Sequence, residues 1–195
     1  MPPSQTSEPP PTREELVKAL HDLFYVATQC TSYHYAFAML FPEAAVNGTE
    51  VHPNREQRLM LNAISEATLM FVRKSAEFFK PEERSDKPDT VYSYRYPGYT
   101  QQEWIIPQET YREFHKRVGH ITIREARYGK VEWPVFPLAI QAVRKWAEFF
   151  GMVGTSYSKT DPGTKEFCTH CATAMIKVGA AMEHDVAVTE KIAKG

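Results

Sequence analysis

The stretch NAISEATLMFVRKSAEFF, residues 62–79, is mostly apolar, as expected for a helix in the core of a bundle. Its polar members Asn62, Glu66, Arg73 and Glu77 are separated by 4, 7 and 4 positions, which places them along one line of that helix. A buried charge without a partner is costly, so these side chains must reach solvent or meet other polar groups. They form either a solvent-facing edge, with Arg73 and Glu77 as an i,i+4 pair, or the wall of a groove.

The helix that contains this stretch has recognisable ends. Asn54 is a good capping residue at its start, and Pro81 follows Lys80 at its end. Apolar residues surround almost its whole circumference, which predicts a central and buried place in the fold.

Apolar spacing predicts further helices on both sides. Thr12 and Glu15 form a capping box that opens the first helix, and its apolar stripe runs without a break from Leu16 to Phe41, before Pro42. Three more helices are expected, over residues 108–127, from about 134–137 to Gly151, and over residues 164–183.

These elements predict an all-α fold, an antiparallel bundle of four to five helices. Residues 81–107, which include VYSYRYPGY, are expected to form one long irregular connection whose tyrosines pack against the bundle. Residues 1–12 are expected to be a disordered Pro-rich tail, residues 13–185 a single domain, and residues 186–195 a frayed C-terminal tail.

The composition excludes several classes of protein. The formal net charge is −1, so no global field draws the chain to nucleic acid or anionic lipid. No apolar run approaches the roughly 20 residues that cross a bilayer. Three cysteines and the absence of a signal-like apolar start are typical of a cytoplasmic protein rather than a disulfide-stapled one.

The helix predicted over residues 108–127 carries a basic face. Such a face can bind phosphates, and a histidine within it can perform acid–base chemistry near neutral pH. The alternative is a solvated surface whose charge is balanced by nearby acidic residues. The face consists of Arg112, Lys116, His120, Arg124 and Arg127.

Cys168 and Cys171 form a Cys-x-x-Cys pattern. A structural zinc site needs four ligands, and no second pair with suitable spacing is present. Cys171 also lies on the apolar stripe of its helix, so both residues are interpreted as core cysteines, and no metal or cofactor is predicted.

Two segments resemble an uncharacterised group of bacterial helical proteins related to the HEPN superfamily. The resemblance covers residues 59–140 and rests on Asn62, Glu66, Arg73, Phe78, Phe79, residues 118–122, Arg127, Trp133 and Pro134. It implies a four- or five-helix bundle that often dimerises, and in many members a metal-independent ribonuclease. Active members carry an arginine followed by a histidine after four to six residues, and no arginine of this chain is followed by a histidine at that spacing.

The expected function is therefore a HEPN-like binding or interaction module, self-associating as a homodimer and linked to a partner protein or RNA, with a role in defence as one possibility. The alternative is a ribonuclease with a non-standard centre, in which His120 is the acid or base, Arg73 or Arg124 stabilises the phosphorane and Glu66 orients a histidine or arginine. Asn62, Lys116, Arg124 and Arg127 would bind the ligand. The sequence leaves open whether the protein is an enzyme.

Overall fold

The structure is a computed structural model that describes residues 10–43, 52–80, 91–100 and 134–194, with side chains up to residue 186. These residues contain no strand, and the all-α prediction is confirmed. The described elements are the helices α1 (Arg13–Gln29), α2 (Ser32–Leu40), α4 (Arg55–Phe78), α7 (Val135–Ser156) and α8 (Pro162–Lys194), with a 3-10 turn, η2 (Ser93–Arg95).

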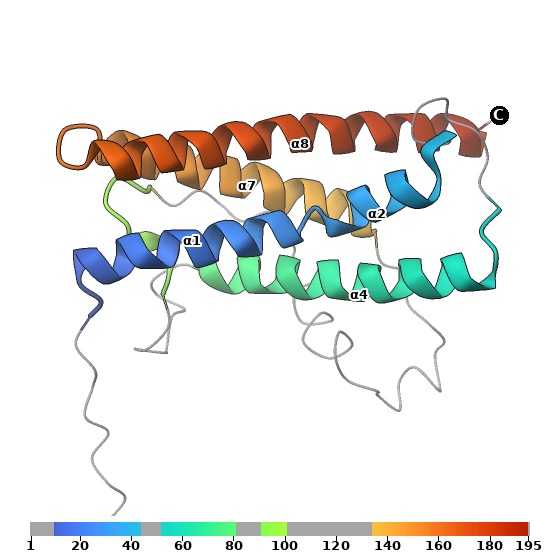
Figure 1. Cartoon of the computed structure of the whole chain (residues 1–195), viewed down its shortest axis with the longest axis horizontal. Coiled ribbons are helices and arrows are strands. Elements are labelled where there is room, and N and C mark those ends of the chain that lie inside the picture. Colours follow the sequence, from blue (N-terminus) through green and yellow to red (C-terminus); the bar gives the residue numbers. More distant parts are fainter. Residues whose placement is uncertain (1–9, 44–51, 81–90, 101–133, 195) are drawn as a thin grey trace, which may run out of the picture.

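The helices form a bundle in which α1 and α8 run in one direction and α4 and α7 run in the other (Figure 1). A tight turn over residues 157–161 joins α7 to α8, and these two helices are antiparallel neighbours. The helix predicted over residues 108–127 lies outside the described residues.

Helix starts follow the capping residues of the sequence. Thr12 and Glu15 form the predicted capping box of α1, and Asn54 caps α4 by accepting from the Gln57 N–H at 2.9 Å. The α8 helix starts earlier than predicted, at Pro162, because the Asp161 carboxylate accepts from the backbone N–H of Thr164 at 3.0 Å. Proline suits the first position of a helix, where its missing N–H has no partner to lose.

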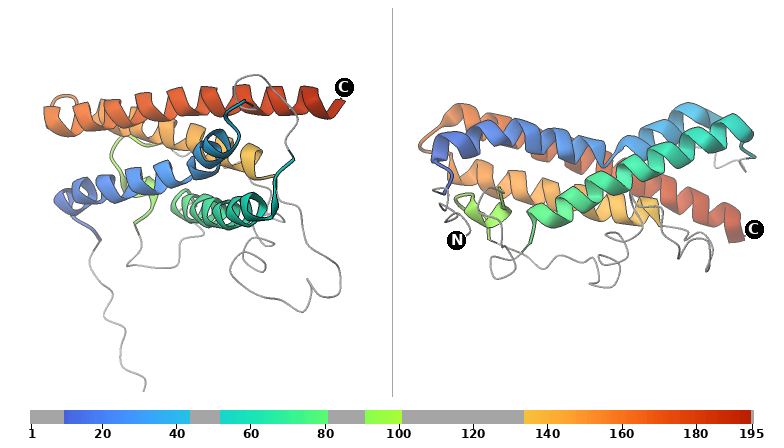
Figure 2. Two further views of the ribbon diagram at one scale, coloured as in Figure 1. Left: turned by 45° about the vertical axis from the view of Figure 1, so that its right-hand side comes forward. Right: turned by 90° about the horizontal axis from the view of Figure 1, so that it is seen from below.

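The continuous helix predicted from Thr12 to Phe41 is wrong, because the chain breaks at Cys30 and Thr31. The N–H of Thr31 bonds the carbonyl of Thr28 at 3.0 Å, and its hydroxyl donates to the same oxygen at 2.6 Å. A threonine hydroxyl competes for nearby backbone groups in this way, and the tighter turn ends α1. The α2 helix then continues at an angle to α1 (Figure 2).

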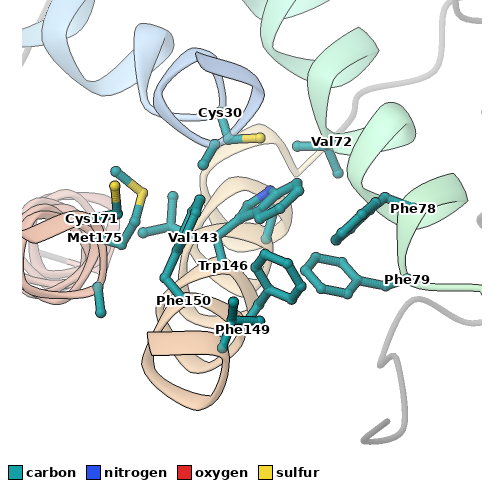
Figure 3. Close-up of a cluster of buried hydrophobic side chains, with 14 of the residues drawn as sticks. Cys30, Val72, Phe78, Phe79, Val143, Trp146, Phe149, Phe150, Cys171 and Met175 are labelled. Carbon is teal, nitrogen blue, oxygen red and sulfur yellow. The ribbon is translucent and has the colours of Figure 1, made fainter. Parts of the chain in front are cut away.

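The most central helix is α7, whereas the sequence predicted that place for α4. Trp146 of α7 is fully buried and lies among side chains from α1, α4 and α8 (Figure 3). In α4 the buried positions begin only at Thr68, and Leu59 and Met60 are 60% and 52% exposed. Leu59 and Met60, in the first half of α4, therefore lie outside the core.

Both C-terminal helices are longer than predicted. The α7 helix passes through Gly151 and Gly154 and ends at Ser156. A Cβ on Gly154 would lie 3.0 Å from the Cβ of Cys168, so glycine permits the close approach of α7 and α8 there. The α8 helix continues to Lys194, and the residues that we expected to be frayed are helical.

Tyrosines from the predicted irregular connection pack against the bundle where that connection is described. Tyr92, Tyr96 and Tyr99 are buried, and the Tyr96 hydroxyl donates to the carbonyl of Leu16 in α1 at 3.0 Å. Gly98 has a φ of 76°, and a Cβ there would meet Ser156 at 2.5 Å. The turn therefore needs glycine to close against the end of α7. Residues 81–90 and 101–107 of the connection lie outside the described residues.

The Ser75 hydroxyl links three helices and provides a test of the core. It accepts from the Trp146 indole N–H at 2.8 Å and lies 3.5 Å from the Cys30 sulfur. Ser75→Ala would leave the indole N–H buried without an acceptor and should lower the free energy of unfolding by about 2 kcal/mol in urea denaturation.

Thr173→Ala is the matched control. The Ser75 hydroxyl donates to the carbonyl of Phe71, four residues earlier, at 2.8 Å, and the Thr173 hydroxyl makes the same bond to the carbonyl of Thr169 at 2.8 Å, but on an exposed surface. Its change should stay within about 0.5 kcal/mol. Equal losses for the two variants would show that the bond to Trp146 contributes nothing.

Candidate functional site

The first candidate site is a buried pair formed by His34 of α2 and Asp185 of α8. Nδ1 of His34 lies 2.7 Å from Oδ2 of Asp185, and each residue is only 8% exposed. The two atoms are at ion-pair distance, but their directions do not meet hydrogen-bond geometry. The contact is ionic only where the His34 imidazole is protonated.

The break between α1 and α2 positions this pair. Tyr33 and Phe37 of α2 pack their rings against Phe136 of α7 at 4.9 and 5.9 Å, and the intervening His34 then meets Asp185 of α8. The pair joins the N-terminal and C-terminal helices, so we interpret it as a structural tie. The pair was not predicted from the sequence, although Asp185 follows Met182 by three residues and so continues the inward stripe of α8.

The polar line of α4 divides into two parts. Asn62 and Glu66 are exposed, as a solvent-facing edge would have them, and whether they line a groove with His120 stays a prediction. Arg73 and Glu77 are half-buried, and Glu77 forms an ion pair with Lys80 at 2.6 Å. The line therefore begins at the solvent and becomes more enclosed toward the C-terminal end of α4.

The predicted partners of this line lie outside the described residues. They are His120, Lys116, Arg124 and Arg127, together with Arg112. Their contact with Glu66 and Arg73 stays a prediction.

The three cysteines are buried thiols. Burial raises the pKa of Cys168 to about 11 and that of Cys171 to about 12, and both side chains have no exposed surface. Metals and electrophiles react with the thiolate, and these pKa values keep both thiols protonated at neutral pH. Within the described ranges no three His, Cys, Asp or Glu side chains gather as metal ligands would.

The second candidate site is an apolar surface on α4. Its buried residues face α1 and α7, and a row of exposed or half-buried residues lies on the opposite side of the helix. We call this row the outer face of α4. It consists of Glu56, Leu59, Met60, Ala63, Ala67, Met70 and Lys74.

The His34–Asp185 pair can be tested by removing its carboxylate. Asp185→Ala would leave a buried imidazole without its counterpart and should lower the free energy of unfolding by about 3 kcal/mol. Asp22→Ala, at an exposed position of α1, is the control and should change it by less than about 0.5 kcal/mol. Adding His34→Ala to Asp185→Ala should cost less than the sum of the two single changes, and strict additivity would show that the residues do not interact.

Comparison of the chain with models of known protein families, with curated proteins and with solved structures finds no match. None of the described helices has a stretch both long and apolar enough to traverse a bilayer.

Proposed function

We propose that the protein is a HEPN-like helical interaction module that self-associates through the outer face of α4. The observation that carries the proposal is the exposure of Leu59 and Met60, at 60% and 52%, on a helix whose other side enters the core. A surface helix normally turns polar residues to solvent, and a contiguous apolar surface often marks an interaction site.

The chemistry of this surface supports a protein partner. Five of its seven positions, in the middle of the row, are methionine, leucine or alanine, and its two charged residues, Glu56 and Lys74, stand at opposite ends. A phosphate-binding surface would instead gather several arginines or lysines. Any contact with RNA would depend on Lys116, Arg124 and Arg127, outside the described residues, and self-association does not require them.

The buried ionisable groups support the same reading. His34 and Asp185 are engaged with each other, and burial raises the pKa of the Cys30 thiol to about 12. These groups serve packing in the described fold. Among the described residues, the outer face of α4 gathers several apolar side chains in one exposed row.

Self-association can be measured by analytical ultracentrifugation at protein concentrations from about 1 to 100 µM. Met60→Asp should raise the dissociation constant at least about tenfold, because a carboxylate at an apolar contact must lose its water. Ile176→Asp is the matched control, since Ile176 is 63% exposed on α8, and it should leave association unchanged. A wild-type chain that stays monomeric throughout this range would contradict the proposal.

The ribonuclease alternative is tested separately with labelled RNA. The interaction module is expected to leave the RNA intact, or to show the same background cleavage as His120→Ala. Cleavage by the wild-type protein that His120→Ala abolishes, with the variant folded by circular dichroism, would establish the enzyme instead.

A further inference from the structure

We infer that two copies of this chain pair through α4 in antiparallel orientation, centred on position 65, with Met60 facing Met70 and Ala63 facing Ala67 of the second copy. This inference rests on the proposed self-association and specifies its geometry. It follows from the spacing, size and charge of residues along the outer face.

The outer face has the spacing of a helix–helix seam. Six of its residues recur at intervals of 4, 3, 4, 3 and 4, which keeps them in one row along a helix that pairs with another. The first and last of them are charged and the four between them are apolar. The seam consists of Glu56, Met60, Ala63, Ala67, Met70 and Lys74.

The seam is symmetric about its middle. Ala63 and Ala67, Met60 and Met70, and Glu56 and Lys74 form three pairs that share one midpoint, at position 65. A twofold axis through that point would bring the two members of each pair together across the interface. The same surface then meets itself on the second copy, as an isologous dimer requires.

The sizes of the side chains suit this arrangement. Alanines at the centre allow the two helices to approach to about 8 Å, the short end of the usual range. Methionines on both sides of the alanines then fill the widening space with flexible apolar chains.

The charges decide between the two possible directions. In the antiparallel pair, Glu56 of each copy faces Lys74 of the other, which gives one attractive contact at each end. A parallel pair would set Glu56 against Glu56 and Lys74 against Lys74, which is repulsive at both ends. The seam spans about 27 Å, so the contact is modest in area and the dimer should form in the micromolar range.

Cysteine cross-linking tests the register. Ala63→Cys and Ala67→Cys would face each other across the axis, whereas two copies of either variant would hold their cysteines several ångströms apart along the helices. A mixture of the two variants should therefore form disulfide-linked dimers at least about tenfold faster than either variant alone. The native cysteines do not compete, because Cys30, Cys168 and Cys171 have no exposed surface, and the wild-type chain controls for them.

Charge reversal gives an independent readout. Glu56→Lys should raise the dissociation constant about tenfold, because it places like charges at both ends, and Glu56→Lys/Lys74→Glu should restore it. Both positions are exposed, and thermal unfolding of each variant would confirm that the fold is retained.

The outcomes separate this inference from the proposed function. Fast cross-linking of Ala63→Cys with itself, or a double charge reversal that fails to restore association, would overturn the antiparallel register while leaving self-association intact. A chain that is monomeric at all concentrations would overturn both.

Discussion

The contact between Trp146 and Ser75 is the interaction on which the arrangement of the bundle depends. The indole is the largest fully buried side chain among the described residues, and its N–H, which cannot be left without an acceptor, bonds the Ser75 hydroxyl at 2.8 Å. The same hydroxyl lies 3.5 Å from the Cys30 sulfur, so one polar contact fixes α7, α4 and α1 together. Phe78 stacks on the indole at 4.9 Å with an angle of 17° between the rings, and this fixes the end of α4 over α7 (Figure 3).

This central contact also explains why the two halves of α4 differ. The aromatic residues and Ser75 lie in its second half, where Val72 and Ala76 are buried beside them. Tyr33 of α2 contacts Ser65 in the first half of α4. Tyr33 and its neighbours cover only one side of α4 there. The opposite side keeps Met60 and Ala63 at the surface. An apolar surface of this kind is unfavourable in water, and a second helix that covers it would remove that cost.

The sequence predicted those features of the helices that depend on residues close together along the chain. The Thr12 and Asn54 caps were confirmed, and the inward stripe of α8 through Cys171 and Met182 was confirmed because period and burial agree there. The break at Thr31 was not predicted, because the apolar stripe continues across it, and the helix ends through bonds from the Thr31 N–H and hydroxyl to the Thr28 carbonyl. The burial of α4 was overestimated because periodicity records which residues are apolar and does not record whether a neighbouring helix covers them. The His34–Asp185 pair was missed because its members are 151 positions apart and meet only in the folded chain.

The polar line on α4 and the apolar row beside it have one common explanation. Glu66 lies one helical turn from both Ala63 and Met70, and Arg73 lies one turn from Met70, so the line borders the outer face along its length. Protein interfaces usually have this anatomy, an apolar centre with a polar and solvated rim. In the proposed pairing, Asn62 and Glu66 keep their exposure because a rim residue does not need to lose its water. A helix that enters the core on one side and meets a second copy on the other would be largely apolar on both sides, with a polar line along the border between them, where Asn62, Glu66, Arg73 and Glu77 lie in α4.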